Sequence, residues 1–155
     1  MEQKTYIDPE YLAKGKELCA LKVEFNVVKT QEALTNVFIC MRNMKVLLPL
    51  RPSKDSDIGT KHDIVIGDRH FSPDTIQAQD GSGFLAVFSQ PEEIPEAMAK
   101  VTTFRYMDTV ECVEMAHDFD GFIGIVLDPY TERLVLPFEV ADQIKNMPID
   151  AAVLN

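Results

Sequence analysis

The sequence predicts an α+β fold, with a mixed β-sheet that contains β-hairpins and carries helices packed on its faces. Two nearly continuous apolar runs, residues 84–88 (FLAVF) and 122–127 (FIGIVL), have the composition of strands buried on both faces. Apolar residues also recur at helical spacing, as in residues 34–41. The predicted order is helix, strand, strand, hairpin, helix, strand, helix, hairpin and helix, and this mixture favours a layered α+β architecture.

The N-terminal 43 residues are predicted to be helical. The pair Asp8-Pro9 is typical of a helix start, and the first helix has a loose apolar stripe that Gly15 interrupts. Thr30 is a good N-cap for a second helix, whose apolar stripe occupies residues 34–41. We therefore expect residues 1–43 to form a helical N-terminal extension.

The central part of the chain is predicted to be rich in strands. Residues 46–48 and 63–67 have the composition of short strands, and the polar loop at 51–61 separates them. Residues 75–89 are predicted to form a hairpin, because the glycines in the turn at 80–83 reach positive φ without a Cβ penalty.

The C-terminal half alternates between helices and strands. Apolar spacing predicts a helix that ends near residue 101, and β-branched and aromatic residues at 102–106 predict the strand that follows. Residues 109–117 are predicted to form another helix. The strand at 122–127 then leads through a turn to its hairpin partner at 133–136, and a last helix follows.

Composition narrows the class of partner. The 155 residues include 46% hydrophobic residues and carry a formal net charge of −10. No linker or internal repeat interrupts the chain, so we expect one domain over residues 1–155. An acidic surface repels phosphate backbones and anionic lipids, which argues against nucleic-acid and membrane partners. It suits solubility or a basic protein partner, whereas the apolar tail at 148–154 favours a protein partner or self-association.

The cysteines and the N-terminus predict a cytoplasmic protein. Cys19, Cys40 and Cys112 are odd in number and show no CxxC spacing, which is typical of reduced thiols. The first 19 residues lack the apolar segment of a secretory signal, and the longest apolar runs are too short to span a bilayer.

Some histidines and aspartates offer weak candidates for metal ligands. Imidazole and carboxylate groups from neighbouring loops commonly bind metals, but the spacing here matches no zinc signature. We therefore expect no metal and no other cofactor. The weak candidates are His62, Asp68, His70, Asp74, His117 and Asp120.

No motif assigns a catalytic residue. The serines do not lie in a GxSxG motif, and the chain lacks Rossmann and Walker fingerprints. The glycine-rich turn at 80–83 leads into a strand and no lysine follows it, so it is better explained by a hairpin than by a phosphate loop.

Two aromatic residues are candidates for a contact surface. Tyr130 follows Asp128-Pro129 at a predicted turn tip, where an exposed aromatic side chain often marks a binding surface, although a bare turn explains it equally well. Phe71 and the loop at 51–61 are further candidates, and the apolar tail at 148–154 could meet a partner.

Three segments together resemble a known family. They are VLLPLRP at 46–52, DGSGFLAVFSQPEEI at 80–94 and GIVLDPYTERLVLPFEVADQI at 124–144. This pattern is similar to the SseB N-terminal domain family, named for bacterial enhanced-serine-sensitivity proteins, over a core at 46–144. The resemblance implies a bacterial, cytoplasmic α+β domain without established catalytic residues. Asp128 stands where asparagine is common in the family.

The residues and the resemblance favour a non-catalytic protein-interaction or regulatory module. One alternative is a small metal-dependent hydrolase that uses the loop histidines and aspartates. Another is a sensor that binds a small ligand in a pocket at the sheet edge.

Overall fold

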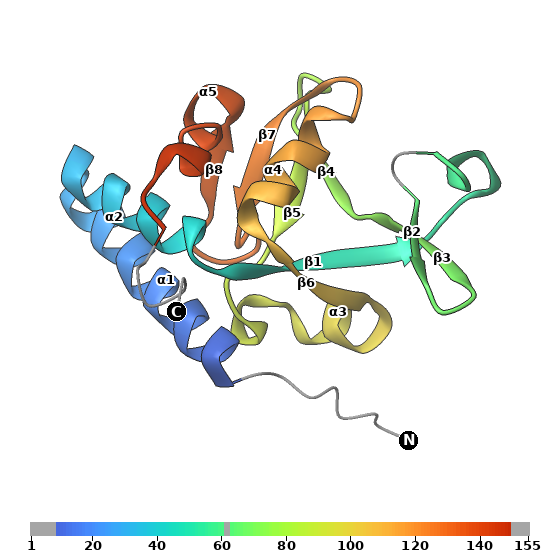
Figure 1. The fold of residues 1–155 in the computed structure, drawn as a ribbon, viewed down its shortest axis with the longest axis horizontal. Coiled ribbons are helices and arrows are strands. Elements are labelled where there is room, and N and C mark those ends of the chain that lie inside the picture. The colour runs from blue at the N-terminus through green and yellow to red at the C-terminus, as the bar shows by residue number, and fades with distance from the viewer. Residues whose placement is uncertain (1–8, 61–62, 150–155) are drawn as a thin grey trace.

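The computed structural model describes residues 9–60 and 63–149 and confirms the α+β class (Figure 1). The helices are α1 (Pro9–Val28), α2 (Gln31–Arg42), α3 (Glu96–Val101), α4 (Thr109–His117) and α5 (Phe138–Ala141). The strands are β1 (Lys45–Pro52), β2 (Ile64–Ile66), β3 (Arg69–Pro73), β4 (Thr75–Gln77), β5 (Gly83–Val87), β6 (Thr103–Asp108), β7 (Phe122–Leu127) and β8 (Leu134–Pro137).

The strands form two four-stranded sheets, where the sequence predicted one mixed sheet. The first sheet has the order β2-β3-β1-β6 and is antiparallel throughout. The second has the order β4-β5-β7-β8, and its central pair, β5 and β7, is parallel. Side-chain periodicity indicates which faces of a strand are buried but not which strands share hydrogen bonds, so the division into two sheets could not be predicted.

A short backbone bridge joins the two sheets. The N–H of Leu47 in β1 donates to the carbonyl of Phe88 at 2.9 Å, and the N–H of Phe88 donates back to Leu47 at 2.9 Å. Both side chains are buried. The run at 84–88, predicted as a buried strand, therefore also connects the two sheets.

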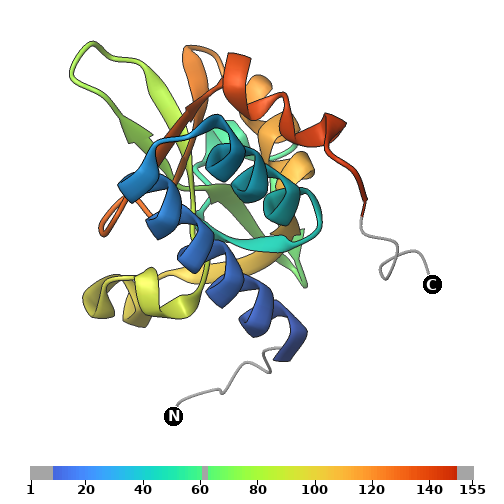
Figure 2. The same ribbon diagram turned by 90° about the vertical axis from the view of Figure 1, so that its left-hand side faces the viewer.

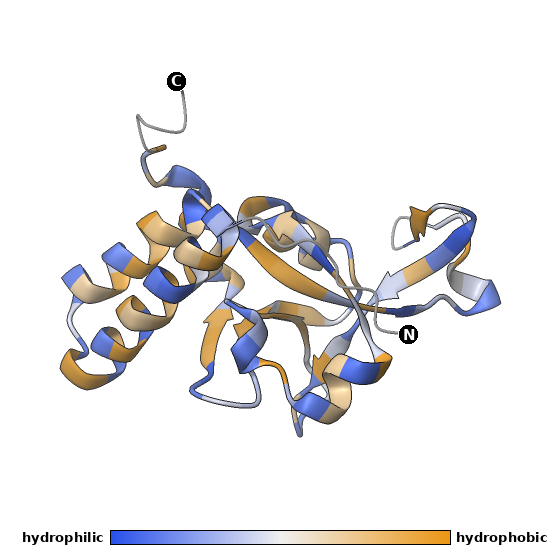
Figure 3. Cartoon of the chain, turned by 90° about the horizontal axis from the view of Figure 1, so that it is seen from below, coloured by the Kyte–Doolittle hydropathy of each residue, from blue (hydrophilic) through white to orange (hydrophobic). Residues whose placement is uncertain are grey.

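β1 is the longest strand and connects two parts of the molecule. Its first six residues pair with β6, and its last three pair with β3. The mostly hydrophobic β1 crosses the middle of the molecule, from α2 at one end to the β2–β3 hairpin at the other (Figure 3). The β2–β3 hairpin extends away from the helices (Figure 1).

α2 and α4 cover the sheets with apolar faces, as the sequence predicted, whereas α3 buries none of its residues and leaves Val101 85% exposed. Val37, Phe38 and Met41 of α2 and Cys112 and Ala116 of α4 are buried in the main core. α4 packs on β7, and α1 lies beside α2 (Figure 2). None of the helices in the described ranges has the length and apolarity needed to cross a lipid bilayer.

Gly15 interrupts the apolar stripe of α1 but not the helix, and it lets the helix approach the segment that follows β5. A Cβ atom at this position would overlap the carbonyl oxygen of Ser89 and would lie 3.2 Å from the Cβ of Gln90. Glycine is used here because the backbone of another segment comes this close. α1 therefore continues through Gly15 to Val28, and its N-terminal half is held in a defined place.

Candidate functional site

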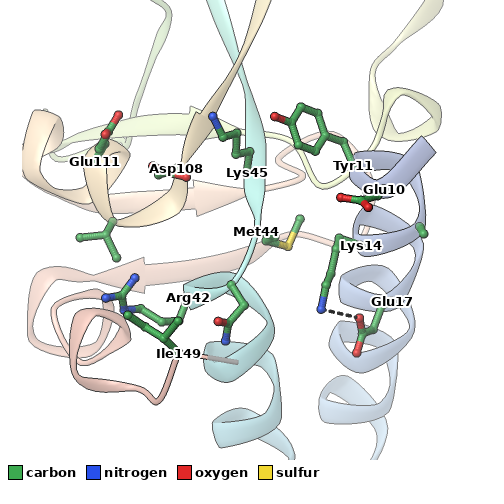
Figure 4. Close-up of a pocket in the computed structure, with 13 residues that line it drawn as sticks. Glu10, Tyr11, Lys14, Glu17, Arg42, Met44, Lys45, Asp108, Glu111 and Ile149 are labelled. Atoms are coloured by element: carbon green, nitrogen blue, oxygen red, sulfur yellow. Dashed lines mark ion pairs between the residues drawn. The ribbon is translucent and has the colours of Figure 1, made fainter. Parts of the chain in front are cut away.

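A groove of about 760 Å³ lies between α1, the start of β1 and the start of α4 (Figure 4). Tyr11 and Lys14 project from α1, Met44 and Lys45 lie at the start of β1, and Val110 belongs to α4. The three elements are distant in sequence and meet here because β1 pairs with β6, which leads directly into α4.

Apolar groups form much of the groove surface. Met44 is almost fully buried, and Tyr11, Val110 and Ile149 also line the cavity. The ring of Tyr11 packs against Tyr106 with a centroid distance of 4.7 Å. Because its ring is held on one side, Tyr11 presents a fixed aromatic surface.

Charged side chains surround this apolar surface. Lys14 pairs with Glu17 at 3.4 Å along α1, and both line the groove. Asp108 and Glu111 lie near the start of α4, and neither forms an ion pair with another described residue. This side of the groove therefore offers two carboxylates to a positively charged group.

Arg42 provides the opposite charge on another side of the groove. It is the last residue of α2 and lies beside Ile149 (Figure 4). Its Nε atom is buried and has no hydrogen-bond partner in the described part of the chain. A buried donor without a partner is unfavourable. Arg42 as a whole is partly exposed and lines the groove, so an acceptor of a ligand could meet its guanidinium group, although not the buried Nε atom.

A second polar cluster lies in the interior and centres on the fully buried Lys22 of α1. The Nζ atom of Lys22 is 2.6 Å from Oδ2 of Asp128 and 3.6 Å from Oε1 of Glu93. Ser89 donates to Asp128 from both its backbone N–H, at 2.8 Å, and its hydroxyl, at 2.7 Å. The side chains of Lys22 and Asp128 are both 0% exposed. Burial raises the pKa of Asp128, and the donors Lys22 and Ser89 offset part of that rise.

The Lys22 cluster explains the one group of three potential metal-ligand atoms in residues 9–60 and 63–149. These atoms belong to Cys19, Glu93 and Asp128 and lie within 4.8 Å of one another. The ammonium group of Lys22 already neutralises the carboxylates there and would repel a cation. Burial also raises the pKa of Cys19 to about 11, so its thiol stays protonated near neutral pH. The cluster thus fits an ion pair that anchors α1 better than it fits a metal.

A family model for the SseB protein N-terminal domain matches residues 23–141. The chain belongs to the SseB N-terminal domain family. The match begins inside α1 and includes α2, upstream of the 46–144 core that the sequence motifs indicated. Neither the curated proteins nor the solved structures contain a significant match.

The histidines that the sequence analysis considered in this SseB N-terminal domain are separate. His70 lies 2.7 Å from Asp63, and His117 lies 2.7 Å from Asp142 and stacks on Phe138. His62 lies outside the described residues. Each described histidine therefore has its own carboxylate neighbour, and the two pairs are better explained as structural contacts than as one metal site.

The aspartates considered as ligands do not gather either. Asp74 accepts a hydrogen bond from the backbone N–H of Thr75 at 3.0 Å, and Asp68 and Asp120 lie at turns. Among the described residues, none of the three belongs to a group of three potential metal ligands. The structure thus brings together no metal site from the candidates that it describes.

The two aromatic candidates lie in different environments. Phe71 is 5% exposed and belongs to the main core, which is a correction to its expected place on a contact surface. It is buried because β3 lies between β1 and β2 and turns this side chain inward. Tyr130 is 55% exposed at the β7–β8 turn and stacks on Phe88.

The sequence did not reveal the groove or the Lys22 cluster. Lys22 has the appearance of an ordinary surface lysine, and only its contact with Asp128, 106 positions away, shows otherwise. The residues around the groove come from four separate parts of the chain. No local pattern could have indicated either feature.

The pair between Asp63 and His70 predicts acid sensitivity in the β2–β3 hairpin. The backbone N–H of Gly59, at 2.9 Å, lowers the pKa of Asp63 below its ordinary value of 3.8, and His70 adds to this effect. A depressed carboxyl pKa contributes stability above the ordinary pKa and loses it as the pH falls through the folded-state pKa. We expect carbon-13 NMR of the carboxyl groups to show Asp63 titrating below pH 3.8, together with loss of the hairpin amide signals.

The matched variant for this titration is Asp63→Asn, which has no carboxyl at this position. Its hairpin amide signals should be weakened already at neutral pH and should lack the acid-dependent step. An acid-dependent step that is identical in wild type and variant would contradict the assignment to Asp63.

Proposed function

We propose that this SseB N-terminal domain is a non-catalytic protein-interaction module that binds a partner segment in the groove between α1, β1 and α4. The observation that carries this proposal is the groove itself, with apolar surface flanked by charges of both signs. The described residues that line it include no histidine, cysteine or serine. They are better suited to contact than to acid–base or nucleophilic chemistry.

The size and surface of the groove suit a short extended segment. Its volume of about 760 Å³ lies within the range of cavities that hold small-molecule ligands. Apolar contacts inside and polar groups at the edge are also the usual anatomy of a protein interface. We therefore propose a partner segment with apolar side chains and charged neighbours.

Charge indicates what kind of protein would bind. The net charge of −10 favours encounter with a basic protein, because opposite charges raise the rate of association. Asp108 and Glu111 offer carboxylates that a lysine or arginine of the partner could meet. The described cysteines are free, which is compatible with the proposed bacterial cytoplasm. Tyr130 stays a predicted second contact.

The test places the same substitution at two exposed alanines of α1. Ala13 lines the groove, whereas Ala20 lies two turns further along and does not. Because both positions are exposed, an arginine at either one would not be buried. A photo-crosslinking residue at position 13 should capture a specific partner in the native host, whereas the same residue at position 20 should not. Ala13→Arg should then weaken binding of that purified partner by about tenfold or more, with Ala20→Arg close to wild type.

Two results would overturn the proposal. One is equal capture from positions 13 and 20. The other is unchanged affinity of Ala13→Arg when the variant is folded, as judged by its circular dichroism and denaturation midpoint. Either outcome would mean that the groove is not the contact surface.

A further inference from the structure

The β2–β3 hairpin exposes an unusual amount of apolar surface. Val65 is 55% exposed and Ile66 is 40% exposed, although both belong to a strand. β2 is an edge strand of only three residues. Beyond it, Gly67 with φ 65° and Asp68 form the tight turn to β3. The hairpin tip thus exposes Val65 and Ile66, which as neighbours in a strand project from opposite faces, and a carboxylate two residues after Ile66.

The chemistry of this tip is complementary to that of the groove. The apolar side chains of Val65 and Ile66 match the apolar surface formed by Tyr11 and Val110. Asp68 is exposed and forms no ion pair with a described residue. Arg42 is partly exposed and lines the groove. A carboxylate and a guanidinium form strong charge-assisted hydrogen bonds.

The hairpin cannot reach the groove of its own molecule. The groove lies at the Lys45 end of β1, whereas the hairpin joins the sheet at the Pro52 end. Eight residues of strand separate these ends by roughly 23 Å at 3.3 Å per residue. The hairpin also points away from α1 and α2 (Figure 1). The hairpin could therefore enter only the groove of another molecule.

We infer that a second copy of this chain inserts its β2–β3 hairpin into the groove, with Asp68 of one copy meeting Arg42 of the other. The inference rests on the proposed function, because it takes the groove to be a binding surface. The contact is head-to-tail, so in a pair one copy keeps its groove free and the other keeps its hairpin free. Further copies can bind at these free surfaces, and larger assemblies form as concentration rises. The segment 51–72 contains four basic and four acidic residues, so its formal net charge is zero. The hairpin region therefore does not add to the repulsion between acidic molecules.

Self-association is tested by complementation between two variants. Ala13→Arg blocks the groove but leaves the hairpin intact. The double variant Val65→Thr with Ile66→Thr removes apolar surface from the hairpin, keeps residues that favour strands and leaves the groove intact. In sedimentation velocity, wild type should increase in mass with concentration, and each variant alone should remain a monomer. A mixture of the two should form a one-to-one dimer, because each supplies the surface that the other lacks.

Charge reversal tests the specific contact between the copies. Arg42→Glu and Asp68→Arg should each abolish association, because each places like charges together. An equimolar mixture of the two single variants should restore association, because both contacts between unlike copies pair opposite charges, and the two variants should alternate in assemblies that grow with concentration as those of wild type do. Ala20→Arg and Asp120→Arg serve as matched controls and should associate like wild type.

The outcomes separate this inference from the proposed function. A wild type that stays monomeric up to millimolar concentration overturns self-association. So does association that survives both Ala13→Arg and the hairpin variant. In either case, specific crosslinking of a different protein at position 13 would leave the proposed function standing.

Discussion

Replacing Asp128 with asparagine is expected to lower the free energy of unfolding by about 3–5 kcal/mol. The substitution removes the negative charge that faces the Nζ atom of Lys22 at 2.6 Å and leaves a buried ammonium group without its main counter-ion. Asparagine keeps the size of the side chain. It also tolerates the left-handed backbone conformation at this position, where φ is 51°. The decrease in the free energy of unfolding therefore measures the effect of the buried charge and not a change in the shape of the turn.

Urea denaturation followed by circular dichroism measures this effect. The matched control is Asp142→Asn, which breaks an ion pair with His117 whose side chains are 39% and 44% exposed. Solvent weakens such a pair, so the control should lose no more than about 1 kcal/mol. Equal midpoints for Asp128→Asn and wild type would show that Lys22 and Asp128 do not form a stabilising pair.

The second large effect is expected from Gly124→Ala, which should destabilise the protein by about 1–3 kcal/mol. A Cβ atom on Gly124 would overlap the carbonyl oxygen of Leu136 and would lie 2.7 Å from the Cα of Pro137. These are backbone atoms of β8, the strand paired with β7. They cannot move aside without disturbing the pairing of the two strands.

Gly83→Ala is the matched comparison, since Gly83 lies in the neighbouring strand β5. There, a new Cβ would meet only the ring of Phe122, a side chain that can rotate away. Gly83→Ala should therefore have a higher denaturation midpoint than Gly124→Ala. The opposite order would mean that β8 adjusts more easily than the Phe122 ring.

The elements that could be predicted are those whose residues carry their own signal. The runs in β5 and β7 consist almost entirely of apolar residues, and most of β5 and the last four residues of β7 are buried as expected, although Ile123 is exposed. The regular stripe of α2 and its N-cap Thr30 also agree with the structure, where Thr30 accepts a hydrogen bond from Ala33. In each case short-range periodicity and capping reflect the local environment directly.

Other predictions failed where a distant contact decides the role of a residue. Gly15 was expected only to interrupt an apolar stripe, but the backbone of Ser89 lies against it. Phe71 was expected on a contact surface but is enclosed in the core by the strands beside β3. Lys22 gave no sign of burial, because its partner Asp128 is 106 positions away.

The α+β class, the main buried strands and the resemblance to the SseB N-terminal domain family could all be predicted, because they depend on local patterns. The division of the strands between two sheets, the counter-ion of Lys22 and the groove between α1, β1 and α4 became visible only in the folded chain. Strand pairing, buried charge and cavities depend on which distant segments meet. The spacing of residues along the sequence does not predict these long-range contacts.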